Sequence, residues 1–68
     1  MAKRFSSDAF LRILIAEGFR LVSQRGSHAK YRDDHGHTVI VPHPRKDIPV
    51  GTVRSMIRQS GLPAERFD

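Results

Sequence analysis

The pattern of apolar and polar residues begins with a helical period. Between residues 8 and 18 apolar side chains recur every three or four positions, which predicts an amphipathic helix. Ser6 or Ser7 can cap its first turn, and Gly18 can adopt the backbone conformation that ends it. The first element is therefore expected to be a helix of roughly three turns.

From Phe19 onward the period changes to two, which is typical of β-strands. Three runs with this period follow one another, in residues 19–24, 28–32 and 37–42. In the first run Phe19, Leu21 and Ser23 are expected to share one face. Pro42 ends the third run or marks it as an edge strand. Because short turn sequences separate the runs, we expect an antiparallel meander.

The middle run has the clearest alternation. His28, Lys30 and Arg32 fall on one side, while Ala29 and Tyr31 fall on the other. If the apolar pair packs against helices, the other side presents a basic stripe headed by an imidazole.

A second helical period follows a proline-rich loop. The loop "HPRKDIP" is expected to be ordered, and residues 50–62 carry apolar side chains at helical spacing, with Pro49 suited to the first turn and Gly61 to the C-cap. The order helix, three strands, helix predicts a two-layer α+β domain with both helices on one face of a three-stranded antiparallel sheet. The opposite face of the sheet would stay open to solvent.

Length and composition limit the choices further. The chain has 68 residues, enough for one domain over residues 1–68, with residues 1–5 and 63–68 expected to be flexible or peripheral. It has no cysteine and no apolar run long enough to span a membrane. Because its basic start, "MAKRFSSDAF", lacks a following apolar segment, no secretory signal is expected and the cytoplasm is the expected location.

Charge adds a candidate partner. Twelve Lys and Arg against seven Asp and Glu leave a net charge of +5, which attracts polyanions such as nucleic acid. The same charge can instead serve only to keep a small protein soluble. Where the Lys and Arg residues lie must therefore decide between nucleic-acid binding and solubility.

All four histidines lie between residues 28 and 43, which raises the question of a metal site. His35, His37 and His43 lack the cysteine partners or helical spacing of common zinc sites, so no metal is predicted. His35 and His37 are interpreted as turn residues, and His43 as a residue that fixes its loop.

His28 has more reactive neighbours. Gly26 permits an unusual backbone angle and Ser27 adds a hydroxyl, so an anion could approach the ring, while Arg25 and Lys30 supply positive charge. RNA cleavage without metal needs a base for the 2′-hydroxyl, cations for the phosphorane and an acid for the leaving oxygen. An imidazole can transfer protons near neutral pH. A surface histidine beside a lysine is also a common solvated pair, so chemistry alone leaves both interpretations open.

Two stretches resemble the HicA family of bacterial and archaeal toxins. They are "GFRLVSQRGSHAKYR" and "TVIVPHPRKDIPVGTVRSMIRQSGL", and with the spacing between them the likeness runs from Ser7 to Leu62. The resemblance implies a fold like the double-stranded RNA-binding domain and an mRNA interferase that needs no metal and slows translation. It also implies that His28, in the "GSH" motif, is the catalytic histidine; a second histidine that often follows in the family is replaced here by Ala29.

The resemblance further implies two partners, mRNA and a HicB-type antitoxin that covers the active site. The antitoxin would bind operator DNA, so the toxin would contact that DNA only indirectly. As RNA contacts we select residues of the turn, the second strand and the following loop: Arg25, Gly26, Ser27, Lys30, Arg32, Arg45 and Lys46. The competing hypothesis is a non-catalytic RNA-binding module of the same fold. A third possibility is a domain that only binds its antitoxin.

Overall fold

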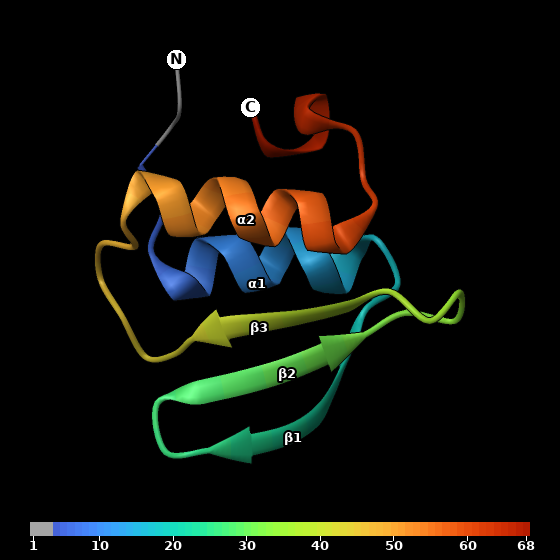
Figure 1. The fold of residues 1–68 in the computed structure, drawn as a ribbon, viewed down its shortest axis with the longest axis horizontal. Coiled ribbons are helices and arrows are strands. Elements are labelled where there is room, and N and C mark those ends of the chain that lie inside the picture. The colour runs from blue at the N-terminus through green and yellow to red at the C-terminus, as the bar shows by residue number, and fades with distance from the viewer. Residues whose placement is uncertain (1–3) are drawn as a thin grey trace.

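The fold was analysed in a computed structural model, which describes residues 4–68. Its elements are α1 (Ser7–Ala16), β1 (Arg20–Arg25), β2 (His28–Arg32), β3 (Thr38–Pro42), α2 (Val50–Ser60) and a short 3₁₀ helix, η1 (Ala64–Phe67). The predicted order helix, three strands, helix is confirmed. Both helices lie on the same side of the sheet, and β1 is the strand farthest from them (Figure 1).

The sheet is antiparallel with the strand order β1-β2-β3. In β2 and β3 buried and solvent-facing residues alternate, as two-layer packing requires. Ala29, Val39 and Val41 are fully buried on the helix side, and Tyr31 lies beside them at 9% exposure. The predicted alternation of β2 is therefore confirmed, and the opposite face is uncovered.

Strand β1 departs from the predicted alternation because it contains a β-bulge. Leu21 lies opposite Tyr31 on the helix side of the sheet, but Ser23 lies opposite Lys30 on the other, uncovered side. The extra residue between them, Val22, turns the rest of the strand over. The expectation that Leu21 and Ser23 share a face is wrong.

Helix α1 begins with a side-chain cap. The Ser6 hydroxyl accepts a hydrogen bond from the Ala9 amide at 3.1 Å, which satisfies one free donor of the first turn. Phe10 and Leu14 are completely buried against the sheet. Helix α2 ends as predicted at Gly61, with φ at 69°, whereas Pro49 precedes the helix as its N-cap instead of lying in the first turn.

The two ends of the described chain contribute to the core. Phe5 and Phe67, which the sequence placed in flexible or peripheral ends, are 4% and 2% exposed. Their rings pack on Phe10, with the Phe10 and Phe67 rings stacked at 4.9 Å between centroids. Phe5 also pairs with Ile48, whose amide donates to its carbonyl at 2.8 Å. Residues 1–3, which belong to the same expectation, lie outside the described residues.

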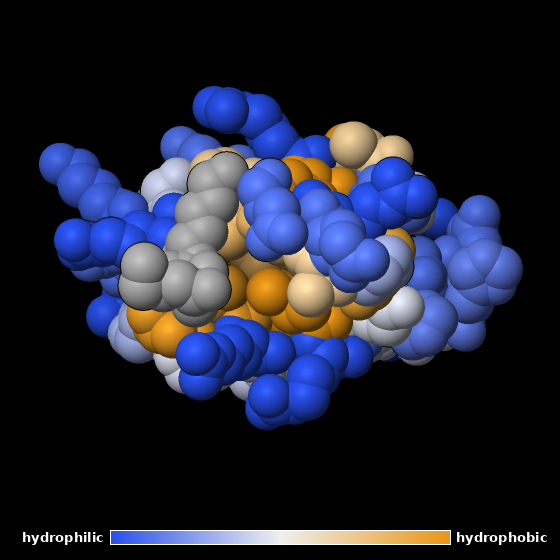
Figure 2. Space-filling model, turned by 90° about the horizontal axis from the view of Figure 1, so that it is seen from above, coloured by the Kyte–Doolittle hydropathy of each residue, from blue (hydrophilic) through white to orange (hydrophobic). Residues whose placement is uncertain are grey.

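On the face seen from above the helices, Figure 2 shows hydrophilic residues around a central area of apolar residues. In the described part of the chain no helix is long and apolar enough to cross a membrane.

Candidate nucleic-acid interface

The open face of the sheet is a grid of three rows, each crossing all three strands. The pairings of the strands give its rows as Arg20, Arg32, Thr38; Ser23, Lys30, Ile40; and Arg25, His28, Pro42. None of these nine residues is acidic. We call this set the open face.

A concavity lies on the open face, around His28. It has a volume of about 440 Å³ and is lined by Ser23, Arg25, His28, Lys30 and Ile40. The His28 residue is exposed, and its direct cross-strand neighbours are Arg25 and Pro42. Among residues 4–68 neither Arg25 nor Lys30 has a carboxylate partner within ion-pair distance. Their positive charge is therefore available to an anion bound in the concavity.

The turn before His28 is held from two sides. Gly26 has φ at 52°, a left-handed conformation that glycine adopts without steric cost. The side-chain amide of Gln24 donates to the Gly26 carbonyl at 3.0 Å and to the His43 carbonyl at 3.2 Å. The His43 amide donates to the Ser27 carbonyl at 2.8 Å. The loop after β3 thus fixes the turn that carries His28.

That loop is anchored in turn on α1. Ser7 is 1% exposed, and its hydroxyl bonds the Nδ1 of His43 at 2.7 Å and accepts from the Arg45 amide at 2.9 Å. The Ser7 amide donates to the Arg45 carbonyl at 2.8 Å, and the Asp8 carboxylate lies 3.8 Å from the same His43 nitrogen. The interpretation of His43 as a residue that fixes its loop is consistent with these bonds.

The predicted RNA contacts do not all meet at one place. Arg25, Lys30 and His28 line the concavity, whereas Arg32 lies in the far row and donates to the Thr38 hydroxyl at 3.1 Å. Arg45 and Lys46 line a different depression, of about 400 Å³, at the start of α1. The loop cations Arg45 and Lys46 therefore do not line the concavity at His28. Of the turn residues, Gly26 and Ser27 precede His28 directly but do not line the concavity.

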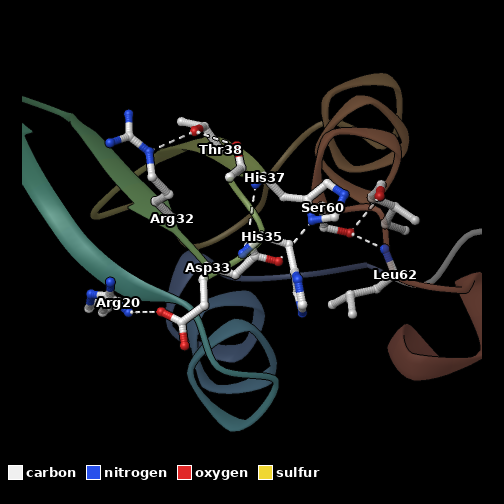
Figure 3. A network of polar contacts seen from close by, with 11 residues as sticks. Arg20, Arg32, Asp33, His35, His37, Thr38, Ser60 and Leu62 are labelled. Carbon is white, nitrogen blue, oxygen red and sulfur yellow. Dashed lines mark hydrogen bonds and ion pairs between the residues drawn. The ribbon is translucent and has the colours of Figure 1, made fainter.

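Two other histidines belong to a cluster in the β2–β3 turn. Asp33 accepts hydrogen bonds from the His37 ring at 2.8 Å and from the amides of His37 and His35 at 2.8 and 3.0 Å. Desolvation opposes ionisation of this carboxyl, but the bonds and charge of His37 and the His35 amide outweigh it and lower the pKa of Asp33. Figure 3 shows the cluster beside the end of α2. A Cβ on Gly61 would come within 2.5 Å of the His37 ring, so the turn and helix are in tight contact.

His35 and His37 form hydrogen bonds within the β2–β3 turn, and neither lines the concavity at His28. Among residues 4–68, no group of three His, Cys, Asp or Glu side chains is arranged to hold a metal ion. The rings of His35 and His37 are 6.4 Å apart between centroids. The hydrogen bonds observed at His35 and His37 go to Asp33 of the same turn, as the interpretation of both as turn residues expects.

Sequence reasoning missed three residues near the site: Ser23, Gln24 and Ile40. Ser23 was assigned to the wrong face because nothing in "LVSQ" signals a bulge. Gln24 holds the turn through hydrogen bonds to the main-chain carbonyls of Gly26 and His43, and the apolar–polar pattern of the sequence does not reveal such bonds. Ile40 was not singled out, because its place beside Lys30 depends on strand register.

The arrangement suits acid-base chemistry on an anionic substrate. An exposed imidazole can exchange a proton with a bound group, and two unpaired cations beside it can stabilise developing negative charge. The face that carries them is uncovered, so a chain-like substrate has access to it.

Fold and face together define a small basic α+β domain with a histidine-bearing open sheet. A family model described as the HicA toxin of bacterial toxin-antitoxin systems matches residues 7–62, and the chain belongs to this family. A search of curated proteins finds no match.

Proposed function

We propose that this chain is the toxin of a type II toxin–antitoxin pair and acts as an endoribonuclease that cleaves mRNA without a metal cofactor. The observation that carries the proposal is the position of His28, exposed on the open face beside Arg25 and Lys30. Membership of a toxin family supports the same conclusion. Cleavage of messages in the cytoplasm would stop translation.

The proposed step needs only groups of the concavity and of the RNA. A base removes the proton of the ribose 2′-hydroxyl, whose oxygen forms a bond to the adjacent phosphorus. The bond from phosphorus to the 5′-oxygen breaks, and that oxygen takes up a proton. His28 transfers one of these protons, while Arg25 and Lys30 stabilise the charge on the phosphorane. The products carry a 2′,3′-cyclic phosphate and a 5′-hydroxyl.

The proposed partner is an acidic HicB-type antitoxin that covers the open face and connects the toxin to operator DNA. Complementary charge would speed association with a toxin of net charge +5. Binding would also bury surface that a domain of this size leaves exposed, which stabilises the fold.

Induction of the protein in growing bacteria tests the proposal. Wild-type protein should arrest growth and fragment transcripts, and co-expressed antitoxin should prevent both effects. His28→Ala protein should do neither, whereas His35→Ala, which alters an exposed histidine of the β2–β3 turn, should behave as wild type. If His28→Ala arrests growth as strongly as wild type, the non-catalytic RNA-binding module is the better account. If neither protein affects RNA, both RNA hypotheses fail.

A further inference from the structure

The open face is divided by polarity in a way that the cleavage chemistry does not require. Its residues on β1 and β2 include all of its cationic and imidazole groups, whereas β3 contributes Thr38, Ile40 and Pro42. Ile40 is 39% exposed and lines the concavity. One half of the face is therefore suited to anions and the other to an uncharged, partly apolar group.

We propose that Ile40, with Pro42 beside it, is the binding site for a nucleobase of the RNA held at His28. This inference rests on the proposed ribonuclease function and adds an orientation to it. The phosphates of a single strand lie over β1 and β2, and the base of the reacting nucleotide turns onto β3. Ile40 is a specificity-determining residue and takes no part in the proton transfer.

The spacing of the sheet fits this orientation. Pro42 lies directly opposite His28 on β3, and Ile40 is the diagonal neighbour of His28, a relationship that puts two residues roughly 7–8 Å apart. Ile40 also lies directly opposite Lys30. A ribose at His28 with its phosphate toward Arg25 or Lys30 therefore has its base on the Ile40 side.

The partial burial of Lys30 and the size of the concavity also favour a base bound beside Ile40. Lys30 is only partly exposed, as expected when its aliphatic stem lies along the neighbouring side chains and its ammonium group stays in water. The concavity of about 440 Å³ has the size of a site for one small ligand. Unpaired bases bind to proteins largely through contact with their flat faces, which aromatic side chains and also other apolar ones provide.

The orientation also predicts which RNA is accepted. A base can reach Ile40 only when it is unstacked from its neighbours and unpaired, so single strands, loops and bulges should bind and continuous duplex should not. Contact with the flat face of a base does not distinguish strongly between bases.

Binding measurements in the His28→Ala background test the inference without cleavage. The probes are a short single-stranded oligoribonucleotide and its fully abasic counterpart, which keeps every phosphate. Ile40→Ala should weaken binding of the intact strand about fivefold to tenfold and leave the abasic strand unchanged. Ile40→Lys should weaken the intact strand while strengthening the abasic one. Ile40→Tyr, with a larger face, should bind the intact strand more tightly.

Ile15→Ala is the matched control, because Ile15 is an exposed isoleucine on α1. It should change neither affinity, and thermal unfolding should show that every variant is folded. Equal effects of Ile40→Ala on both strands, or no effect on either, would overturn the inference. So would a loss of antitoxin binding with RNA binding intact, which would assign the apolar half to the protein partner. If neither strand binds even with Ile40 present, the proposed function itself fails.

Discussion

Arg25 lies directly opposite His28 across the first hairpin, and the bulge at Val22 is what turns it to the open face. In a regular strand Arg25 would share a face with Leu21 and point toward the helix layer. β-Bulges commonly re-aim side chains beside functional sites, and this one brings a cation next to an imidazole.

Arg25→Ala should therefore reduce kcat for RNA cleavage by a factor on the order of ten to a hundred. The loss is expected to be smaller than for a buried transition-state donor, because Arg25 is exposed and solvent screens its charge. The comparison is with Arg20→Ala, on the same strand and face but ion-paired with Asp34 at 2.8 Å, which should change kcat little. Equal losses in both variants would mean that net charge matters and position does not.

Lys30→Ala should alter binding in a way that salt titration reveals. If its ammonium group neutralises one phosphate, the slope of log affinity against log salt for single-stranded RNA should fall in magnitude by about 0.7. Binding is measured with His28→Ala protein to prevent cleavage. Arg54→Ala, which removes an exposed cation of α2, should leave the slope unchanged. An unaltered slope for Lys30→Ala would remove this residue from the phosphate contacts.

Ser7→Ala should destabilise the fold by about 1–3 kcal/mol, since it leaves the Arg45 amide without its acceptor and the His43 ring without its hydroxyl partner, with only the Asp8 carboxylate nearby at 3.8 Å. Urea unfolding measures this loss. Ser6→Ala removes the α1 cap and should cost about 1 kcal/mol, without effect on the loop. A loss below about 0.5 kcal/mol for Ser7→Ala, the size usual for surface substitutions, would show that the loop is not anchored there.

The Asp33 cluster should make stability depend on pH in the acidic range. Its pKa is lowered in the folded protein, so its contribution to the free energy of unfolding is present above the unfolded-state value near 3.9. That contribution is lost as pH falls through the folded-state pKa, because the unfolded chain binds the proton more readily. Asp33→Asn should lower the unfolding temperature at pH 7 and flatten its rise with pH in the acidic range. Parallel curves for the two proteins would contradict this assignment.

The sequence predicted the arrangement of elements well where burial and periodicity coincide. The alternation of charged and apolar residues in β2 placed His28 and Lys30 on the open face correctly, because the helices cover Ala29 and Tyr31. The same reasoning failed in β1, since its edge position removes the burial signal and Val22 shifts the register.

Long-range contacts account for the remaining differences. Phe5 and Phe67 lie outside any periodic run, yet they join the core through rings that only the folded chain brings together. The position of Arg45 follows from its main-chain bonds to Ser7, 38 residues earlier in the chain. Such contacts have no local signature, so the sequence does not show that Arg45 lines a different depression from the one at His28.

The central claim concerns a single imidazole, and single-turnover cleavage of single-stranded RNA by purified protein in excess chelator tests it most directly. His28→Ala should bind the RNA with nearly unchanged affinity and lose at least about a hundredfold in cleavage rate. Wild-type protein should give fragments ending in 2′,3′-cyclic phosphate. Cleavage by His28→Ala at the wild-type rate would contradict the account.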